Sequence, residues 1–282
     1  MSKYYYVNSR GERIDLCSSP LWAESFNSLR SYAYEPIERN GTVFGHQRRK
    51  NVEKAMRLQY YSSDPEKFAA FADEMYRVTN YDIQAGVYGT LYIGDFFARG
   101  NFPTKAVAEF NPYKRMVIVD VPFFMPEEVW RRELPAIILN GDQSDPSSVP
   151  AIPLANYPSN YPHGYTSGNL SNDFINDSVF PSPFRLAIFG SCTNPSVTIG
   201  GHVYNVNVSV PAGSLLIIDS SEKTIVLYDS NNVGQNVFAY QNHDADKYIF
   251  EPIPVGEVSI RYQNIPSITL TLYEERSAPK WI

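Results

Sequence analysis

The stretch Phe184-Arg-Leu-Ala-Ile-Phe-Gly-Ser-Cys-Thr-Asn-Pro-Ser-Val-Thr-Ile-Gly-Gly201 opens a series of short apolar runs that continues almost to the C-terminus. Residues 196–199 and 202–208 flank Gly200-Gly201, and both glycines accept the positive φ that a two-residue hairpin turn requires. Polar and apolar side chains alternate along the second run, as in a half-buried strand. Short strands at this spacing predict a β-sandwich or jelly roll for this part of the chain, with further strands at 215–218, 224–228, 259–262 and 268–273.

The N-terminal part combines strands with one helix. Residues 4–7 and 13–16 flank a turn-forming cluster and predict a hairpin. Residues 91–93 and 96–98, separated by Gly94-Asp95, predict a second tight hairpin. A further strand is expected at 115–121. This part is therefore predicted to be mainly β.

The helix is expected between Ser63 and about Asn80. Ser63 and Glu66 are spaced as a capping box, and Pro65 is tolerated in the first turn. Apolar side chains then recur at spacings of three and four and predict one buried face, formed by Phe68, Phe71, Ala72, Met75 and Val78.

The composition changes along the chain. Residues 1–133 hold 18 Lys and Arg and 17 Asp and Glu, whereas residues 134–282 hold 6 and 13. The window 134–184 carries only four formal charges, all aspartates, and its eight prolines prevent a regular element from running through it. We therefore expect three parts: a first domain over 1–135, a Pro/Tyr/Asn-rich linker or arm over 136–183, and a second domain over 184–282.

The linker leaves two interpretations open. Its composition fits a partly disordered tether. Its aromatic side chains instead favour a segment that packs against another surface. They are Tyr157, Tyr161, Tyr165, Phe174 and Phe180.

Global properties exclude several classes of protein. A formal net charge of −6 argues against a general nucleic-acid-binding role. No run of eighteen apolar residues occurs, and residues 1–8 contain no apolar signal core, so the protein is expected to remain where it is made, in the cytoplasm of the producing cell. Cys17 and Cys192 lie in different halves and are expected to be unpaired thiols.

The sequence holds no recognisable catalytic or metal-binding motif. It lacks G-x-S-x-G, a Walker loop and G-x-G-x-x-G. The histidines show no H-x-x-x-H spacing and no neighbouring cysteine, which argues against zinc: His46, His163, His202 and His243. We predict that the protein is not an enzyme and has no catalytic, cofactor-binding or metal-binding residue.

A glycosidase needs two carboxylates that converge on one substrate. Glu127-Glu128 and Glu274-Glu275 are adjacent in sequence, so on a strand their side chains point to opposite faces and neither pair converges on one substrate. Asp244-Ala-Asp246 is compatible with a loop calcium site, but a solvated acidic loop is the favoured interpretation.

The densest positive cluster is Arg48-Arg-Lys50 with Lys54 and Arg57. Such a cluster fits contact with an acidic neighbour or with passing DNA. We favour a solvated strand or edge, where Lys and Arg deter strand addition. Trp281 is costly to leave in water and is expected to be packed within the chain or against a neighbour.

The chain also resembles the distal tail proteins of long-tailed bacterial viruses along most of its length. No single stretch of sequence is diagnostic of this family, but the order and spacing of the matching stretches together are specific. The matching stretches are Arg13-Ile-Asp-Leu16, the helix 63–79, Gly89-Thr-Leu-Tyr-Ile-Gly-Asp95, Pro122-Phe-Phe124, the segment 157–184, 188–201, Leu216-Ile-Ile-Asp219, Tyr248-Ile-Phe250, Leu272-Tyr-Glu-Glu-Arg276 and Pro279-Lys-Trp281.

The resemblance implies a hexameric ring under the tail tube, built from an N-terminal β-sandwich with a helix. It implies a galectin-like C-terminal β-sandwich that points outwards. The implied partners are other copies of the chain, the major tail tube protein, the tail-associated hub protein and the tape-measure protein in the lumen, with receptor-binding proteins as further candidates. It places the protein in the virion, at the tail tip or baseplate, and implies neither membrane insertion nor sequence-specific nucleic-acid binding.

The functional hypothesis is therefore a structural ring subunit that connects the tail tube to the hub and the host-adhesion apparatus. A carbohydrate-binding adhesion module, recognising host cell-surface polysaccharide through the C-terminal sandwich, is the alternative. A galectin-like fold alone does not establish sugar binding. A cell-wall hydrolase is the weakest of the hypotheses.

Overall fold

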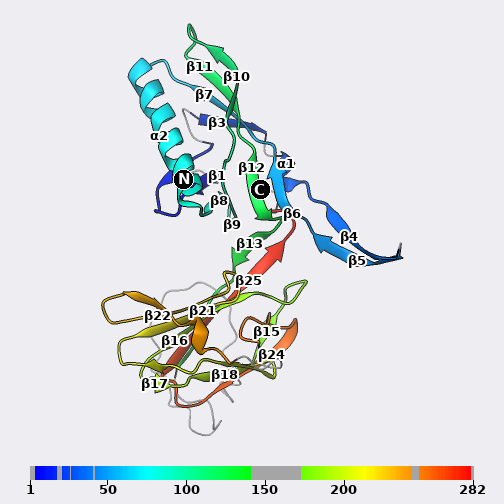
Figure 1. The fold of residues 1–282 in the computed structure, drawn as a ribbon, viewed down its shortest axis with the longest axis vertical. Coiled ribbons are helices and arrows are strands. Elements are labelled where there is room, and N and C mark those ends of the chain that lie inside the picture. The colour runs from blue at the N-terminus through cyan, green and yellow to red at the C-terminus, as the bar shows by residue number, and fades with distance from the viewer. Residues whose placement is uncertain are drawn as a thin grey trace, which may run out of the picture. The chain divides into compact units, whose positions relative to one another are not determined.

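A computed structural model describes residues 4–17, 21–25, 27–40, 42–140, 173–242 and 248–280 (Figure 1). The chain divides into two compact units, unit 1 (Met1–Arg132 with Glu275–Ile282) and unit 2 (Glu133–Glu274). Unit 2 is thus inserted into unit 1, because the chain leaves unit 1 after Arg132 and returns at Glu275.

This division differs from the three parts expected from composition. Residues 275–282 group with the N-terminal unit instead of completing the second domain. Residues 137–140 and 173–176, expected in the linker, are strands of unit 2. The central part of the expected linker, 141–172, and Trp281 lie outside the described residues.

Unit 1 is mainly β with one long helix. Its sheets run in the orders β2-β1-β8-β9-β13, β10-β11-β7-β3, β12-β6 and β4-β5. Its elements in chain order are β1 (Tyr4–Val7), β2 (Arg13–Asp15), β3 (Leu21–Ser25), α1 (Asn27–Arg30), β4 (Tyr34–Arg39), β5 (Thr42–Arg48), β6 (Lys50–Lys54), β7 (Arg57–Tyr61), α2 (Pro65–Ala85), β8 (Gly89–Ile93), β9 (Phe96–Gly100), β10 (Ala106–Asn111), β11 (Met116–Asp120), β12 (Phe123–Glu127) and β13 (Trp130–Glu133), whose last residue belongs to unit 2.

The hairpins and the helix face expected in this unit are confirmed. β1 pairs antiparallel with β2, and β8 with β9 across a two-residue turn in which Gly94 has φ 61°. The apolar stripe of α2 faces the core, where the ring of Phe71 stacks on that of Tyr60 at 4.2 Å between centroids. Burying such rings drives the helix onto the sheet that contains β7.

The ends of α2 differ from those expected. The N-cap is Asp64 rather than Ser63, and its carboxylate accepts the backbone N–H groups of Glu66 and Lys67. The helix also continues past Asn80 to Ala85, where Gly86 in the left-handed region (φ 68°) terminates it.

Replacing Asp64 by alanine should therefore lower the free energy of unfolding of unit 1 by about 1 kcal/mol, because two helical N–H groups lose their acceptor. Urea unfolding followed by circular dichroism measures the change. The matched control is Ser63→Ala, which should change stability by less than about 0.5 kcal/mol. A larger loss from Ser63→Ala than from Asp64→Ala would contradict this assignment of the cap.

Unit 2 is a β-sandwich. One sheet has the order β25-β16-β21-β22-β23 with β14 added on β25, and the other has the order β15-β24-β18-β19; β17 and β20 form a small pair. Its elements are β14 (Ile137–Asn140), β15 (Asp173–Asn176), β16 (Phe184–Phe189), β17 (Cys192–Thr193), β18 (Ser196–Ile199), β19 (His202–Asn205), β20 (Ser209–Val210), β21 (Leu215–Asp219), β22 (Thr224–Tyr228), β23 (Gly234–Asn236), the 3₁₀ turn η1 (Phe238–Tyr240), β24 (Gly256–Tyr262) and β25 (Ser267–Arg276).

The sandwich follows from the alternation seen in the sequence. Residues of both sheets, such as Leu186 and Ile218 from one and Val197 and Ile260 from the other, form a single buried core. The Gly200-Gly201 hairpin is confirmed, with φ 59° and 84° and with Ile199 paired to His202.

Two buried tyrosines make unit 2 sensitive to alkali. Burial, followed by nearby carboxylates, raises the pKa of Tyr204 and of Tyr273 above the ordinary value of about 10. The folded state therefore keeps phenol protons that the unfolded chain loses, so stability is full below pH ~10 and falls as pH rises further.

We expect each of the two tyrosines to contribute a loss of up to about 1.4 kcal/mol per pH unit above pH 10. Tyr204→Phe should remove one such contribution from the slope of unfolding free energy against pH, measured by urea unfolding between pH 8 and 11. An unchanged slope in Tyr204→Phe would contradict the burial argument.

Candidate interaction surfaces

The described residues contain neither a cluster of metal ligands nor a membrane-spanning helix. Within them, no group of three or more His, Cys, Asp or Glu side chains could hold a metal ion. His46 lies exposed on β5, and His202 forms a hydrogen bond through Nε2 with the carbonyl of Tyr248 at 2.9 Å. The candidate calcium loop Asp244–Asp246, His163 and His243 lie outside the described residues. Among the described helices, none has the length and apolarity needed to span a membrane.

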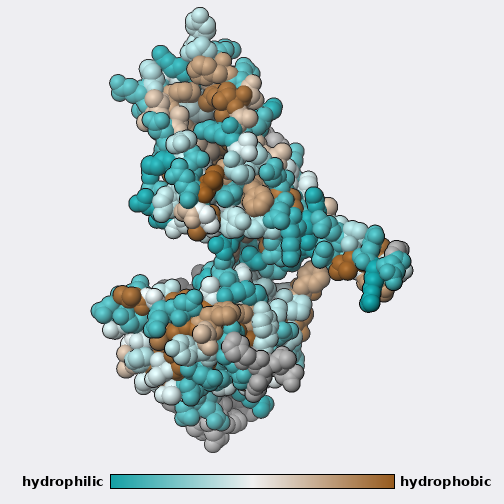
Figure 2. Space-filling view, viewed as in Figure 1, coloured by the Kyte–Doolittle hydropathy of each residue, from teal (hydrophilic) through white to brown (hydrophobic). Residues whose placement is uncertain are grey.

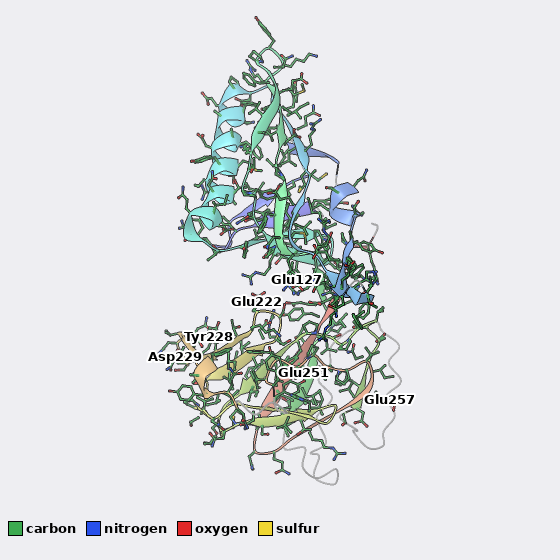
Figure 3. All side chains as sticks on the ribbon, turned by 45° about the vertical axis from the view of Figure 1, so that its right-hand side comes forward. Glu127, Glu222, Tyr228, Asp229, Glu251 and Glu257 are labelled. Atoms are coloured by element: carbon green, nitrogen blue, oxygen red, sulfur yellow. The ribbon has the colours of Figure 1, made fainter. Side chains whose placement is uncertain are left out.

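The labelled carboxylates of unit 2 are spread along it, whereas Glu133 and Asp219 both bind Arg185, at 2.8 and 3.4 Å. Figure 3 shows Asp229 and Glu257 toward opposite ends of this unit, with Glu251 between them. Glu222 lies in the turn that joins β21 and β22.

Glu127 and Glu275 of unit 1 form ion pairs with arginine side chains. Glu275 accepts Arg48 on one carboxylate oxygen and Arg131 Nε on the other, the latter at 2.9 Å. Glu127 (labelled in Figure 3) lies 3.4 Å from Nη2 of the same Arg131. The tertiary structure thus joins Glu127 and Glu275 through the guanidinium of Arg131. The sequence did not indicate this arrangement, because each glutamate was considered only with its neighbour in sequence.

The basic run forms ion pairs, and only part of it is the solvated edge that we favoured. Arg49 lies 3.8 Å from Glu35, and Arg57 lies 2.7 Å from Asp120. Lys54 is buried and forms an ion pair with the buried Glu128. Its Nζ also donates to the carbonyl of Ser31 at 2.6 Å. Lys54 therefore stabilises the interior of unit 1, whereas Arg49 and Arg57 form half-exposed pairs.

The hairpin of β4 and β5, which we call the arm, is an exposed element of unit 1. Its two strands pair only with each other in the described part of the chain, and Figure 1 shows them extending away from the remainder of the unit. It displays apolar side chains, with Phe44 69%, Val43 49% and Ile37 46% exposed, and Figure 2 shows hydrophobic residues among polar ones on it. A two-stranded hairpin is marginal by itself in water, which favours a partner for the arm.

A second exposed element is β10, at the edge of the sheet β10-β11-β7-β3. All its residues except Asn111 are exposed, including the apolar Val107 and Phe110. An edge strand with exposed apolar side chains is a template for pairing with another chain.

Unit 2 carries an uncharged strip on an acidic body. Between residues 133 and 274 the sequence has 13 Asp and Glu and 4 Lys and Arg, a formal charge of −9, against 17 and 20 in unit 1. Two cross-strand rows on the outer face of the larger sheet nevertheless contain no charged residue: Ile138, Thr269, Ala187, Ile217, Val226 and Asn236, and Asn140, Ser267, Phe189, Leu215, Tyr228 and Gly234. A low number of charged residues is typical of the core of a protein interface.

No family model matches the sequence, and no curated protein matches it. Solved structures are similar over almost the whole chain. A chain of the phage P2 baseplate in its activated conformation with Ca has a TM-score of 0.62 at 13% identity, covering 98% of both chains. The same baseplate with Sr gives 0.61 at 14%, covering 98% of this chain and 99% of the other.

The Dit (gp 19.1) protein of SPP1, a paradigm of the hub adsorption apparatus in Gram-positive infecting phages, gives a TM-score of 0.53 at 8% identity, with 97% and 99% of the chains covered. These identities show the fold and no more. The chain has the fold of phage baseplate and Dit hub proteins, so the resemblance seen in the sequence is confirmed at the level of the fold.

Proposed function

We propose that this chain is a structural subunit of a phage tail tip, which closes with other copies, six in number, into a ring between the tail tube and the host-adhesion apparatus. The observation that carries the proposal is the shared fold over 98% of this chain and 98% of the baseplate chain. Both units take part in that match, so the whole architecture of the chain supports the proposal rather than a single domain.

Ring closure needs a heterologous interface in which two different surfaces of one chain meet on its neighbours. Unit 1 offers suitable elements. The arm carries exposed apolar side chains away from its own core, and the edge strand β10 can extend the sheet of a second copy. We infer that these two elements contribute the contacts between copies.

The remaining surfaces fit the other partners of such a ring. The two uncharged rows on the outer face of the larger sheet of unit 2 are a suitable surface for a further protein of the tail tip, such as the hub or a receptor-binding protein. The tail tube and the tape-measure protein would meet unit 1. In this role the protein is a component of the virion and performs no catalysis.

The mass in solution tests the proposal. Light scattering coupled to size exclusion, at several concentrations, should show a particle of six chains of 32.0 kDa each, and negative-stain images should show a ring. If the chain alone is a monomer, the same measurement is repeated with the purified tube and hub proteins as templates. A monomer under all these conditions would overturn the ring.

The adhesion alternative has one observation in its favour. Phe238 and Tyr248 are about half-exposed on unit 2, around the buried ring of Phe250 and beside Lys223. Exposed aromatic rings can stack on sugars. Binding of the full chain to purified cell-wall polysaccharide, lost in Phe238→Ala and Tyr248→Ala, would support this function; no binding at all would end it.

A further inference from the structure

Two side chains at the base of the arm reach the segment by which the chain returns from unit 2. Tyr34 and Arg48 are opposite each other at the open end of the β4–β5 hairpin. The Arg48 guanidinium binds Glu275, and the Tyr34 hydroxyl lies 2.7 Å from the hydroxyl of Ser277. Both partners therefore belong to residues 275–277, directly after the chain re-enters unit 1.

Glu275 is also bound to the strand by which the chain leaves unit 1. Arg131, on β13, donates from Nε to the carboxylate oxygen that Arg48 does not use, at 2.9 Å. The side chains of Arg48, Glu275 and Arg131 are only 22%, 14% and 11% exposed, so solvent screens these contacts weakly. One carboxylate thus compensates two guanidinium groups.

We propose that Glu275 is a latch that fastens the arm to the two strands leading to and from unit 2, so that displacement of residues 275–277 releases the arm. When the carboxylate moves away, Arg48 is left without its anionic partner and Arg131 keeps only Glu127, which disfavours the docked position of the arm. The base of the arm then loses both the ion pair and the hydrogen bond to Ser277.

The consequence for assembly rests on the proposed function. If the arm contacts a neighbouring copy, the latch couples the strands of unit 2 to the contact between copies. A partner that pulls on unit 2 would thereby loosen or reorder the ring, and closure of the ring would in turn hold residues 275–277 in place, since such coupling is reciprocal.

Hydrogen exchange of the full-length chain, kept at a concentration where it is monomeric, tests the latch without requiring a ring. Glu275→Gln keeps the shape of the side chain and removes its charge. We expect amide exchange in both the arm, residues 34–48, and β13 to become about tenfold faster, the size of effect expected from loss of charge-assisted hydrogen bonds.

Two further variants separate the latch from general destabilisation. Arg48→Gln should accelerate exchange in the arm by a similar factor but leave β13 unchanged, because Arg131 keeps Glu275. Glu127→Gln is the matched control. The Glu127 side chain is 45% exposed and binds Arg131 but not Arg48. Its replacement should leave exchange in the arm unchanged. The latch is overturned if Glu275→Gln and Arg48→Gln do not affect the arm, or if Glu127→Gln affects it equally. A failed ring with an intact pattern of exchange would reject the proposed function alone.

Discussion

We expect the Phe44→Glu variant to remain a monomer of 32.0 kDa under conditions in which the unaltered chain forms a ring. Phe44 is 69% exposed on the arm, so glutamate disturbs little within one chain. Burying a phenylalanine contributes about 1.5–3 kcal/mol, and a loss of about 2 kcal/mol weakens one contact about thirtyfold. In a closed ring this loss recurs at every interface.

Light scattering measures the mass, and thermal unfolding checks that the variant is folded. The melting temperature of the monomer should be almost unchanged, because substitutions at exposed positions cost at most about 0.5 kcal/mol. Tyr76→Glu is the control, since Tyr76 is 61% exposed on α2, outside the arm and β10. Rings formed by Phe44→Glu, or equal dissociation in both variants, would remove the arm from the interface.

The second large effect is expected in the stability of unit 1. Lys54→Met leaves the Glu128 carboxylate, whose side chain is 1% exposed, without its cationic partner. Breaking a buried ion pair at one partner costs about 3–5 kcal/mol, because an uncompensated charge remains in the interior. Replacing both partners by Lys54→Met and Glu128→Met should restore most of this loss.

Urea unfolding followed by tryptophan fluorescence measures this effect selectively, since all three tryptophans of the chain belong to unit 1: Trp22, Trp130 and Trp281. The exposed pair of Arg57 and Asp120 supplies the control, and Arg57→Met should cost less than about 1 kcal/mol. If Lys54→Met costs no more than Arg57→Met, the pair does not stabilise the interior as described.

The ends of α2 illustrate how far local patterns reach. Ser63 and Asp64 are both good N-cap residues, and sequence cannot choose between neighbours whose roles depend on the backbone that positions their oxygens. Within the extension to Ala85, the carboxylate of Asp82 accepts the hydroxyl groups of Tyr6 and Ser9, each at 2.6 Å. These partners lie more than seventy positions earlier, so no local pattern reports them.

Local periodicity and turn chemistry were sufficient to predict a mainly β chain with one helix and its principal hairpins. Adjacent residues alone set those preferences, as at Gly200-Gly201, where both positions need positive φ. The ion pairs and the insertion of unit 2 into unit 1 could be recognised only in the folded chain. Lys54 meets Glu128 across 74 positions and Arg48 meets Glu275 across 227, and topology alone brings together charges so far apart in sequence.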